Sequence, residues 1–360
     1  GLITKQPRPV GFTPLQQPVA PRHIAYGRGR KPGVFVYYAS VSGYTLDVLA
    51  FCHGRIAGDW NFYFNDDEVT INPGGTSVSL DGKYGDVVVV KSTDGAATET
   101  AFDHIIEKSE GTWTTAHRGD HTAMAGMRCK MVSQDKMSKV YPNQQIELSA
   151  SADWLCVYDW RADSTAGGSG AQRRDDPTTW EWSDNPIVCQ VHDEWATNYP
   201  LWSNVDTDLA EREQAIADRI WTRRFAPVLD TLTDEADACD EAVTLAAGGT
   251  IPRYGCFVWY DATTDRKSVR EMFKRSCDGW RSERNDGAMI IRCGRWLVAP
   301  TPITASMIVE LGSVSAGTPK SRLINDLQVR YRAPEHLCEV VDTVGWTDEG
   351  SITRRGRKTT

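Results

Sequence analysis

Two histidines that could serve as metal ligands stand four residues apart in the segment His117-Arg118-Gly119-Asp120-His121. On one face of a helix, this spacing would present two nitrogen ligands to an ion such as zinc, with a carboxylate between them. The glycine disfavours that helix, and no third ligand lies nearby in the sequence. The segment is therefore typical of a polar turn, and we predict no metal site here.

An acidic cluster further along the chain is a candidate calcium site. It comprises Asp234, Glu235, Asp237, Asp240 and Glu241. A calcium loop alternates its oxygen ligands and has a central glycine, and the cluster has neither feature. It instead favours the solvated face of a helix, whose early acidic residues lie at the positive end of the helix dipole.

Four of the thirteen tryptophans cluster in sequence: Trp154, Trp160, Trp180 and Trp182. Exposed tryptophans form platforms on which sugar rings stack, and they also anchor subunit interfaces. Burial in the core is the default for such large aromatic side chains. The sequence alone leaves these three interpretations open, so the four residues are candidates for interface or glycan contacts.

Motifs of known catalytic sites are missing from the sequence. It holds no G-x-S-x-G, no H-E-x-x-H and no signature around a catalytic cysteine. The glycines of YGRGRKPG do not form a nucleotide loop, because Pro32 and a strand-like run stand where a phosphate-binding helix would begin. The nine cysteines are odd in number, scattered and without a C-x-x-C pair, which indicates free thiols in a reducing cytoplasm. We therefore expect no catalytic, cofactor-binding or metal-binding residues, and a protein that is not an enzyme.

Length and composition bound the possible functions. With 360 residues, 40% hydrophobic and 24% charged, the chain is long enough for two or three domains with buried cores. The formal net charge of -8 argues against a protein whose main task is to grip a phosphate backbone, although an acidic lining past which DNA slides is compatible with it. No membrane-spanning run or secretory signal is present. The sequence begins with glycine and ends in a basic run, so we expect the native chain to continue.

β-Branched and aromatic runs punctuated by turn formers predict strands in the first part of the chain. Residues 1–22 contain five prolines and should form an extended arm. Strands are expected at 33–41, 44–52, 60–64 and 87–90, with turns at Ser42-Gly43 and Asn65-Asp66-Asp67. Strand patterns return at 323–331 and 339–346, which could rejoin the first sheet or form a further β-domain.

Helical patterns follow in the second part. Apolar residues at Val269, Met272, Phe273, Cys277 and Trp280 predict one buried helix face that starts after Thr264 or Asp265 and ends at Gly279. Further helices are expected from Pro186 toward Trp195, and around Leu209, Ile216 and Ile220. Segments 288–292 and 295–299 read as a hairpin around Cys293-Gly294, and the Gly- and Ser-rich loop 161–174 should lie exposed.

These elements predict an α+β fold that is mainly β, with antiparallel, barrel-like domains and an inserted α+β domain. We expect an arm at 1–22, a first β domain at 23–112, a second α+β domain at 113–300, and returning or further β strands at 301–360.

Four blocks of the sequence resemble the tail tip attachment proteins of lambda-like siphophages, which form the central hub of the tail tip. The blocks are Ala20–Val69 with its Tyr-Gly-Arg strand and His-Gly motif, Thr98–Ala162 with Tyr141-Pro142-Asn143 and Tyr158-Asp159, Trp180–Trp195 with Ser183-Asp184-Asn185-Pro186, and Ile251–Pro300, followed by Asn325–Tyr331. They follow one another in the family's order across about residues 20 to 348. The sequence departs from the pattern at Leu155-Cys156-Val157, which lacks a basic residue, and at Trp160, where a proline is usual.

The resemblance implies hub domains that assemble into a trimeric ring. Such a ring would lie below the distal tail protein, enclose the end of the tape measure protein and carry the tail fibre or receptor-binding protein. It would close the tail tube at the tip of the virion, after assembly in the host cytoplasm, and open for DNA ejection, so that DNA passes through the lumen without specific binding. Contact with the host outer-surface receptor would be indirect, because receptor-binding regions are absent from these residues. A glycan-binding tail adhesin and, less strongly, a tail-associated peptidoglycan hydrolase are the alternatives.

Overall fold

The computed structural model describes residues 14, 20–72, 77–78, 82–196, 207–245, 248–297, 304–310, 324–333, 339–342, 345–356 and 358. Contacts within the chain divide it into two units, residues 1–294 and 295–360. No helix in the described part of the chain is both long and apolar enough to cross a membrane. Most of the expected arm, residues 1–22, lies outside the described residues.

The larger sheet of the first unit is antiparallel throughout and has the strand order β13-β1-β9-β4-β5-β6, with β10 paired to β9. Its strands are β1 (His23–Pro32), β4 (Ile56–Phe64), β5 (Asp67–Ile71), β6 (Ser77–Val78), β9 (Leu148–Val157), β10 (Glu181–Trp182) and β13 (Phe257–Asp261). The central strand β9 is buried along nearly its whole length, because it has neighbours on both sides.

The smaller sheet has the order β2-β3-β8-β7 and is also antiparallel. Its strands are β2 (Val34–Val41), β3 (Tyr44–His53), β7 (Val88–Asp94) and β8 (Thr122–Lys130). The first two form the hairpin predicted around Ser42-Gly43, and both residues have the positive φ angles that a tight hairpin turn requires. The strands predicted at 33–41 and 44–52 are confirmed.

Two of the passages of the chain between the two sheets contain a glycine. Gly33 links β1 to β2, and a Cβ at this position would lie 2.8 Å from the Cβ of Leu49. Gly54, with φ +104°, leads from β3 toward β4. Because these crossings place the sheets face to face, one hydrophobic core fills the space between them. The other face of the smaller sheet is covered by α1 (Asp103–Ile106) and Trp113.

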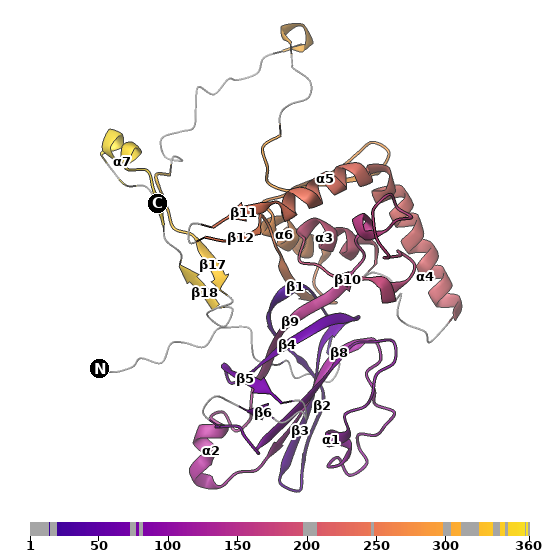
Figure 1. Cartoon of the computed structure of the whole chain (residues 1–360), viewed down its shortest axis with the longest axis vertical. Coiled ribbons are helices and arrows are strands. Elements are labelled where there is room, and N and C mark those ends of the chain that lie inside the picture. The colour runs from indigo at the N-terminus through magenta and orange to yellow at the C-terminus, as the bar shows by residue number, and fades with distance from the viewer. Residues whose placement is uncertain are drawn as a thin grey trace. The chain divides into compact units, whose positions relative to one another are not determined.

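Four helices gather at one end of the larger sheet, away from α1 and α2 (Gln134–Val140) (Figure 1). They are α3 (Pro186–Trp195), α4 (Thr207–Ile220), α5 (Leu229–Asp240) and α6 (Arg266–Ser276). The predicted start of α3 at Pro186 and its end at Trp195 are confirmed. A π-helical turn, Trp221–Phe225, and a 3-10 turn, Ala226–Val228, join α4 to α5. A short exposed hairpin follows, made of β11 (Ala242–Thr244) and β12 (Thr250–Pro252).

The predicted helix around Val269 is confirmed, but its buried face is smaller than expected. Val269 and Phe273 are buried, whereas Met272 is 38% exposed. Trp280 lies beyond the helix, because the chain turns at Asp278, where φ is 47°. Asp265 caps the start by accepting a hydrogen bond from the amide of Ser268.

The prediction of a hairpin at residues 288–299 was wrong, because the strand it contains pairs with a different segment. β15 (Met289–Arg292) pairs with the preceding strand, β14 (Trp280–Glu283), and Arg295–Leu297 form no strand. Gly294 is needed for close packing, since a Cβ there would lie 2.8 Å from atoms of Asp278. The turn of the hairpin instead lies at Asp286-Gly287, where the glycine has φ +85°.

The expected barrel does not close. Among the described strands, β13 and β6 are the ends of the larger sheet, and β2 and β7 are the ends of the smaller one. The sheets also run across the expected boundary between residues 112 and 113, because β8 inserts between β3 and β7 and β9 inserts between β1 and β4. Residues 23–294 therefore share one pair of sheets and the helices packed on them.

The loop 161–174 is largely exposed but is folded on itself through Asp163. This carboxylate is 1% exposed and accepts hydrogen bonds from Tyr158, Thr165 and Arg173. Burial of one acidic residue at its centre gives the loop a fixed shape that its composition did not predict.

The second unit contains four short strands, one 3-10 turn (Ala305–Met307) and one α-helix among its described residues. The pairs are β16 (Asp326–Leu327) with β19 (Trp346–Thr347) and β17 (Arg330–Ala333) with β18 (Glu339–Asp342), followed by α7 (Glu349–Arg355). None of these described strands pairs with a sheet of the first unit.

Candidate functional site

The four candidate tryptophans do not form an exposed platform. Trp154, Trp160 and Trp180 are 0%, 2% and 3% exposed, and Trp182 is half-buried. Each indole N–H donates a hydrogen bond within the chain, to Gly29 O, Thr233 Oγ1, Arg173 O and Gly27 O, respectively. Their faces and their polar edges are thus used in the core, which leaves a sugar ring little to stack on.

Trp160 and Trp180 belong to an aromatic cluster where the helices meet the larger sheet. Trp195 at the end of α3 packs edge-on against Trp180 at 5.8 Å and against Trp221 at 5.6 Å between ring centroids. Tyr158 joins the cluster from the end of β9. Trp195 and Trp221 were not predicted as members of this cluster, because they lie on other helical elements, α3 and the π-helical turn, whose packing is not visible in the sequence.

Two adjacent carboxylates at the end of α3 form the main charged site of the first unit. Asp193 is fully buried and accepts hydrogen bonds from the hydroxyl of Tyr260 and the guanidinium of Arg266. Burial raises its pKa, although Arg266 opposes that shift. These contacts attach α3 to both β13 and α6.

The neighbouring carboxylate, Glu194, is also held by arginine side chains. Arg270 donates two hydrogen bonds to it, at 2.6 and 2.8 Å, and Arg281 donates a third at 2.7 Å. Burial alone would raise the pKa of Glu194, but the two guanidinium groups outweigh burial and lower the pKa to about 2. The side chain is therefore ionised at neutral pH and joins α3, α6 and β14.

The acidic cluster on α5 is divided between solvent and core. Asp234, Asp237 and Asp240 are exposed as predicted, whereas Glu235 is fully buried. Glu235 accepts hydrogen bonds from Arg292 at 2.8 Å and from the amide of Cys293 at 3.1 Å. Expecting all five residues on a solvated face was therefore wrong for Glu235, which a sequence pattern could not separate from its neighbours.

A polar groove of about 600 Å³ lies between α5 and the loop 161–174. Its lining residues include Arg161, Ser169, Asp230, Asp234 and Asp237. Arg161 pairs with Asp237 and Asp240, at 2.8 Å in each case, so part of the acidic charge is already neutralised by the chain. The groove by itself does not indicate a ligand.

Lys31 is fully buried where β1 ends. Its ammonium donates to Phe51 O at 2.6 Å and to Pro32 O at 3.0 Å, and it lies 5.3 to 5.4 Å from the ring centres of Phe51, Trp154 and Trp259. Burial lowers the pKa of Lys31 to about 7. Because Phe51 O belongs to β3, this side chain ties the two sheets together beside the crossing at Gly33.

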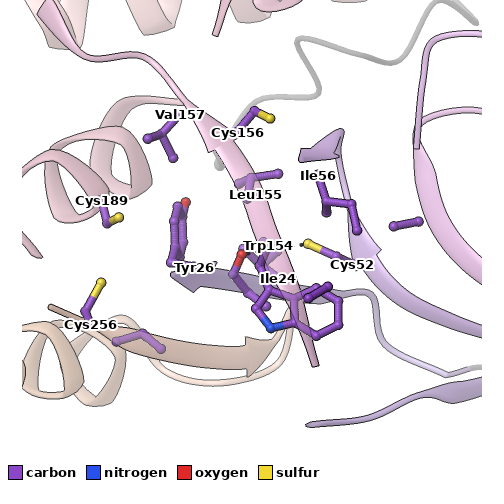
Figure 2. Close-up of a cluster of buried hydrophobic side chains, with 14 of the residues drawn as sticks. Ile24, Tyr26, Cys52, Ile56, Trp154, Leu155, Cys156, Val157, Cys189 and Cys256 are labelled. Carbon is purple, nitrogen blue, oxygen red and sulfur yellow. Dashed lines mark hydrogen bonds between the residues drawn. The ribbon is translucent and has the colours of Figure 1, made fainter. Parts of the chain in front are cut away.

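The cysteines in the described part of the chain are all free and buried. Figure 2 shows Cys189 and Cys256 near Tyr26, and their thiols are in contact with each other. Burial raises the pKa of Cys189 well above its usual range, which disfavours the thiolate that a metal ligand or a nucleophile requires. No group of three or more potential metal-ligating His, Cys, Asp or Glu side chains exists among the described residues, and Cys338 lies outside them.

His117 and His121 lie in a turn and not on a helix. His117 stacks on Trp113 with ring centroids 4.8 Å apart, and its Nδ1 accepts a hydrogen bond from the amide of Thr114 at 2.9 Å. His121, with a φ of 58°, is the last residue before β8. The polar-turn interpretation explains both residues.

No protein-family model matches the chain. No curated protein matches it either. Among solved structures, the chain is similar to one in the "Virion of native gene transfer agent (GTA) particle", with a TM-score of 0.46 and 11% sequence identity. The alignment covers 96% of this chain and 69% of that chain. A likeness at this level leaves the function to be argued from the chain's own residues.

Proposed function

We propose that this protein is the central hub at the tip of a non-contractile phage tail, with a structural and gating role and no enzymatic activity. What supports the proposal is the resemblance of four sequence blocks, in the family's order, to lambda-like tail tip attachment proteins. The ordered set is far more specific than any one of its short motifs.

The short motifs that carry the resemblance lie where the chain changes direction. Tyr141-Pro142-Asn143 follows α2 and precedes β9, and the hydroxyl of Tyr141 donates to Lys130 O at the end of β8. Tyr158-Asp159 follows β9, and the side chain of Asp159 accepts from the amide of Arg161. Asn185-Pro186 starts α3. The resembling motifs therefore contain residues that fix turns and a helix start. This is expected when a shared fold causes the resemblance.

A ring of three copies requires a lateral surface on each copy, and the edge strand β2 fits that need. Among the described strands it pairs only with β3, through seven of its eight residues. Val36 and Tyr38 on this strand are 50% and 54% exposed. Long edges with exposed apolar side chains are rarely left open to solvent, because they pair readily with other chains. In the proposed ring, a neighbouring copy covers β2.

The partners of the proposed hub follow from its position in the virion. The homotrimer lies below the distal tail protein, encloses the end of the tape measure protein and carries the tail fibre or receptor-binding protein. Opening after the receptor signal is a switch between two packed arrangements. The net charge of -8 suits a lumen that DNA crosses without being held.

The glycan-binding adhesin has less support after the structure, because three of the four candidate tryptophans are core residues. The peptidoglycan hydrolase gains no support from the sequence, in which no hydrolase motif was found.

The first experiment measures the mass of the purified protein in solution and images phage particles labelled with an antibody to it. A threefold mass, or monomers in solution with label at the tail tip, supports the hub. Label on fibre ends favours the adhesin, and label on the capsid rules out any tail role.

A further inference from the structure

Asp47 is an acidic residue on β3, one strand away from the edge strand β2. It stands opposite Tyr38 on β2 and Met127 on β8. Directly opposite residues of an antiparallel pair point to the same face, with Cβ atoms about 5 Å apart. Leu49, two residues further along β3, points the same way and belongs to the core between the sheets. The carboxyl of Asp47 therefore lies at the margin of that core.

The Asp47 carboxyl lacks the partners that other buried acidic groups of this protein have. The residue is 3% exposed, its Oδ1 accepts no hydrogen bond, and no cation among the described residues forms an ion pair with it. Asp193, Glu194 and Glu235 are each paired with at least one arginine. A buried carboxylate without a cation is costly, so the neutral acid is the form that fits this position.

The titratable groups around Asp47 do not compensate its charge. They are Cys129 on β8, Tyr141 after α2 and Tyr38 on β2. Burial and the charge of Asp47 both raise the pKa values of the Cys129 thiol and the Tyr141 phenol, so these two groups stay neutral at neutral pH. Ionised Asp47 would therefore have no compensating charge within the core, and water is the remaining source of stabilisation.

The edge strand β2 is the part of the sheet that can give way most easily. Of its eight residues only Val34 is buried, and Tyr38, which stands over Asp47, is 54% exposed. Strand β3, by contrast, is also paired with β8 along its whole length. Segments with few buried apolar contacts open locally at a low cost in free energy. Opening of β2 is thus the shortest way to bring water to the Asp47 carboxyl.

We propose that Asp47 is a proton-controlled latch on the edge strand β2. With its proton, the carboxyl stays between the sheets and the β2–β3 hairpin is closed. When the proton is lost to solvent, the carboxylate becomes hydrated and β2 separates from β3 beside Tyr38. The latch makes the exposure of this edge depend on pH near neutrality.

The sign of the pH dependence follows from the two states of the hairpin. Burial raises the pKa of Asp47 from 3.8 to about 7 in the closed hairpin. Between these values the closed form holds more protons than the open form, so the contribution of the neutral carboxyl to closure is complete below pH 4 and is lost as the pH rises through 7. From pH 5.5 to 8.5 the ratio of open to closed hairpins should rise by about thirtyfold, nearly all of it below pH 7.

The test measures amide hydrogen exchange of the full chain at pH 5.5 and 8.5, corrected for the intrinsic effect of pH on exchange. Peptides from β2 should lose protection by about thirtyfold at the higher pH, whereas peptides from β9, which is paired on both sides, should not. Asp47→Asn carries a neutral group of the same shape and should give equal protection of β2 at both pH values. Asp135→Asn, at an exposed position on α2, is the matched control and should behave like the wild type.

Equal protection of β2 at the two pH values in the wild type, or an unchanged pH dependence in Asp47→Asn, would overturn the proposal. If that variant does not fold, the ¹³C signal of the Asp47 carboxyl in the wild type provides the second test. Its titration should have a midpoint near pH 7 that coincides with the loss of β2 protection, and a midpoint near pH 4 would exclude the latch. The assay follows β2 within each purified chain, so its outcome is independent of the proposed role in the tail.

Discussion

Buried ionisable side chains in this protein differ in how their charges are balanced, and the ammonium of Lys31 lies among aromatic rings. It has carbonyl acceptors and three rings but no carboxylate close enough to form an ion pair among the described residues. Asp193 and Glu194, by contrast, are held by arginines. The two situations predict different responses to pH and to substitution.

Lys31→Met should flatten the dependence of stability on alkaline pH. Burial lowers the pKa of Lys31 from 10.5 to about 7 in the folded chain. Between these pH values the unfolded chain holds more protons than the folded one, so the stability of the wild type rises with pH by up to about 1.4 kcal/mol per pH unit from this group. Methionine removes that contribution.

The measurement is the free energy of unfolding in urea at intervals from pH 7 to 10. Lys136→Met, at an exposed position on α2, is the control and should keep the wild-type slope. Parallel curves for the wild type and Lys31→Met would show that Lys31 is not deprotonated in the folded state over this range.

Arg266→Ala should destabilise the first unit by about 3 kcal/mol or more, because it removes the guanidinium that pairs with the buried carboxylate of Asp193. Lys274→Ala on the same helix breaks an exposed pair with Glu271 and should cost less than about 0.5 kcal/mol. Urea denaturation at pH 7 compares the two variants. A similar small loss in both would mean that Asp193 finds another partner or takes up a proton.

At the scale of elements, the start of α3 is fixed by a side chain with several roles. Asn185 is 1% exposed, and its carbonyl accepts hydrogen bonds from the amides of Ile187 and Val188. Its amide group donates to Ala236 O and to Asp240 Oδ1, at 2.8 Å each. One residue therefore caps α3 and attaches it to α5.

Asn185→Ala should cost about 3 kcal/mol, the sum of a lost cap and of buried groups left without partners. Asp265→Ala removes only the exposed cap of α6 and should cost about 1 kcal/mol. Thermal melts followed by circular dichroism rank the two variants. The reverse order would show that the contact between α3 and α5 contributes little.

The sequence predicted those elements whose signals are local. Asn185-Pro186 marks a helix start within a few residues, and Ser42-Gly43 marks a tight turn, so both could be placed. The hairpin of β14 and β15 was missed although Asp286-Gly287 is a strong turn signal, because a second glycine, Gly294, was taken for the turn residue. Only the packing of Gly294 against Asp278 explains that glycine, and such packing is not visible in a sequence.

The pairing of strands that are distant in the chain could not be predicted from the sequence, for a similar reason. The order of the two sheets depends on β8 and β9, because β8 inserts between β3 and β7 and β9 inserts between β1 and β4. Of these neighbours, β1, β3 and β4 lie roughly seventy or more residues earlier in the sequence. The same holds for the charged site, where Asp193 and Glu194 meet residues from α6 and β14. Asp47 could have been noticed as one acidic residue in an apolar strand, although its isolation depends on what lies across the sheets.

For the whole molecule, the division at residue 294 predicts that the first unit folds alone. A chain that ends at Gly294 should melt cooperatively and retain the chemical shifts of the first unit. A chain that ends at Asp278 should not fold, because it lacks β14 and β15 and thereby Arg281, which donates to Glu194, and Arg292, which donates to Glu235. Solubility and heteronuclear NMR spectra distinguish the two. A folded shorter chain would show that the hairpin is dispensable.

The edge strand β2 connects the fold to the proposed ring. A neighbouring copy that adds a strand or packs on this edge would cover Val36 and Tyr38, and lysines at these two positions would place charges inside that contact. The double variant Val36→Lys, Tyr38→Lys should keep its melting temperature, because both side chains are exposed in the single chain, and should lose the threefold mass or its place at the tail tip. Val243→Lys with Ile251→Lys, on the exposed hairpin β11–β12, is the matched control and should assemble normally. Assembly of the β2 variant at wild-type level would show that β2 is not the contact between copies. The hub role would then require a ring that closes through another surface.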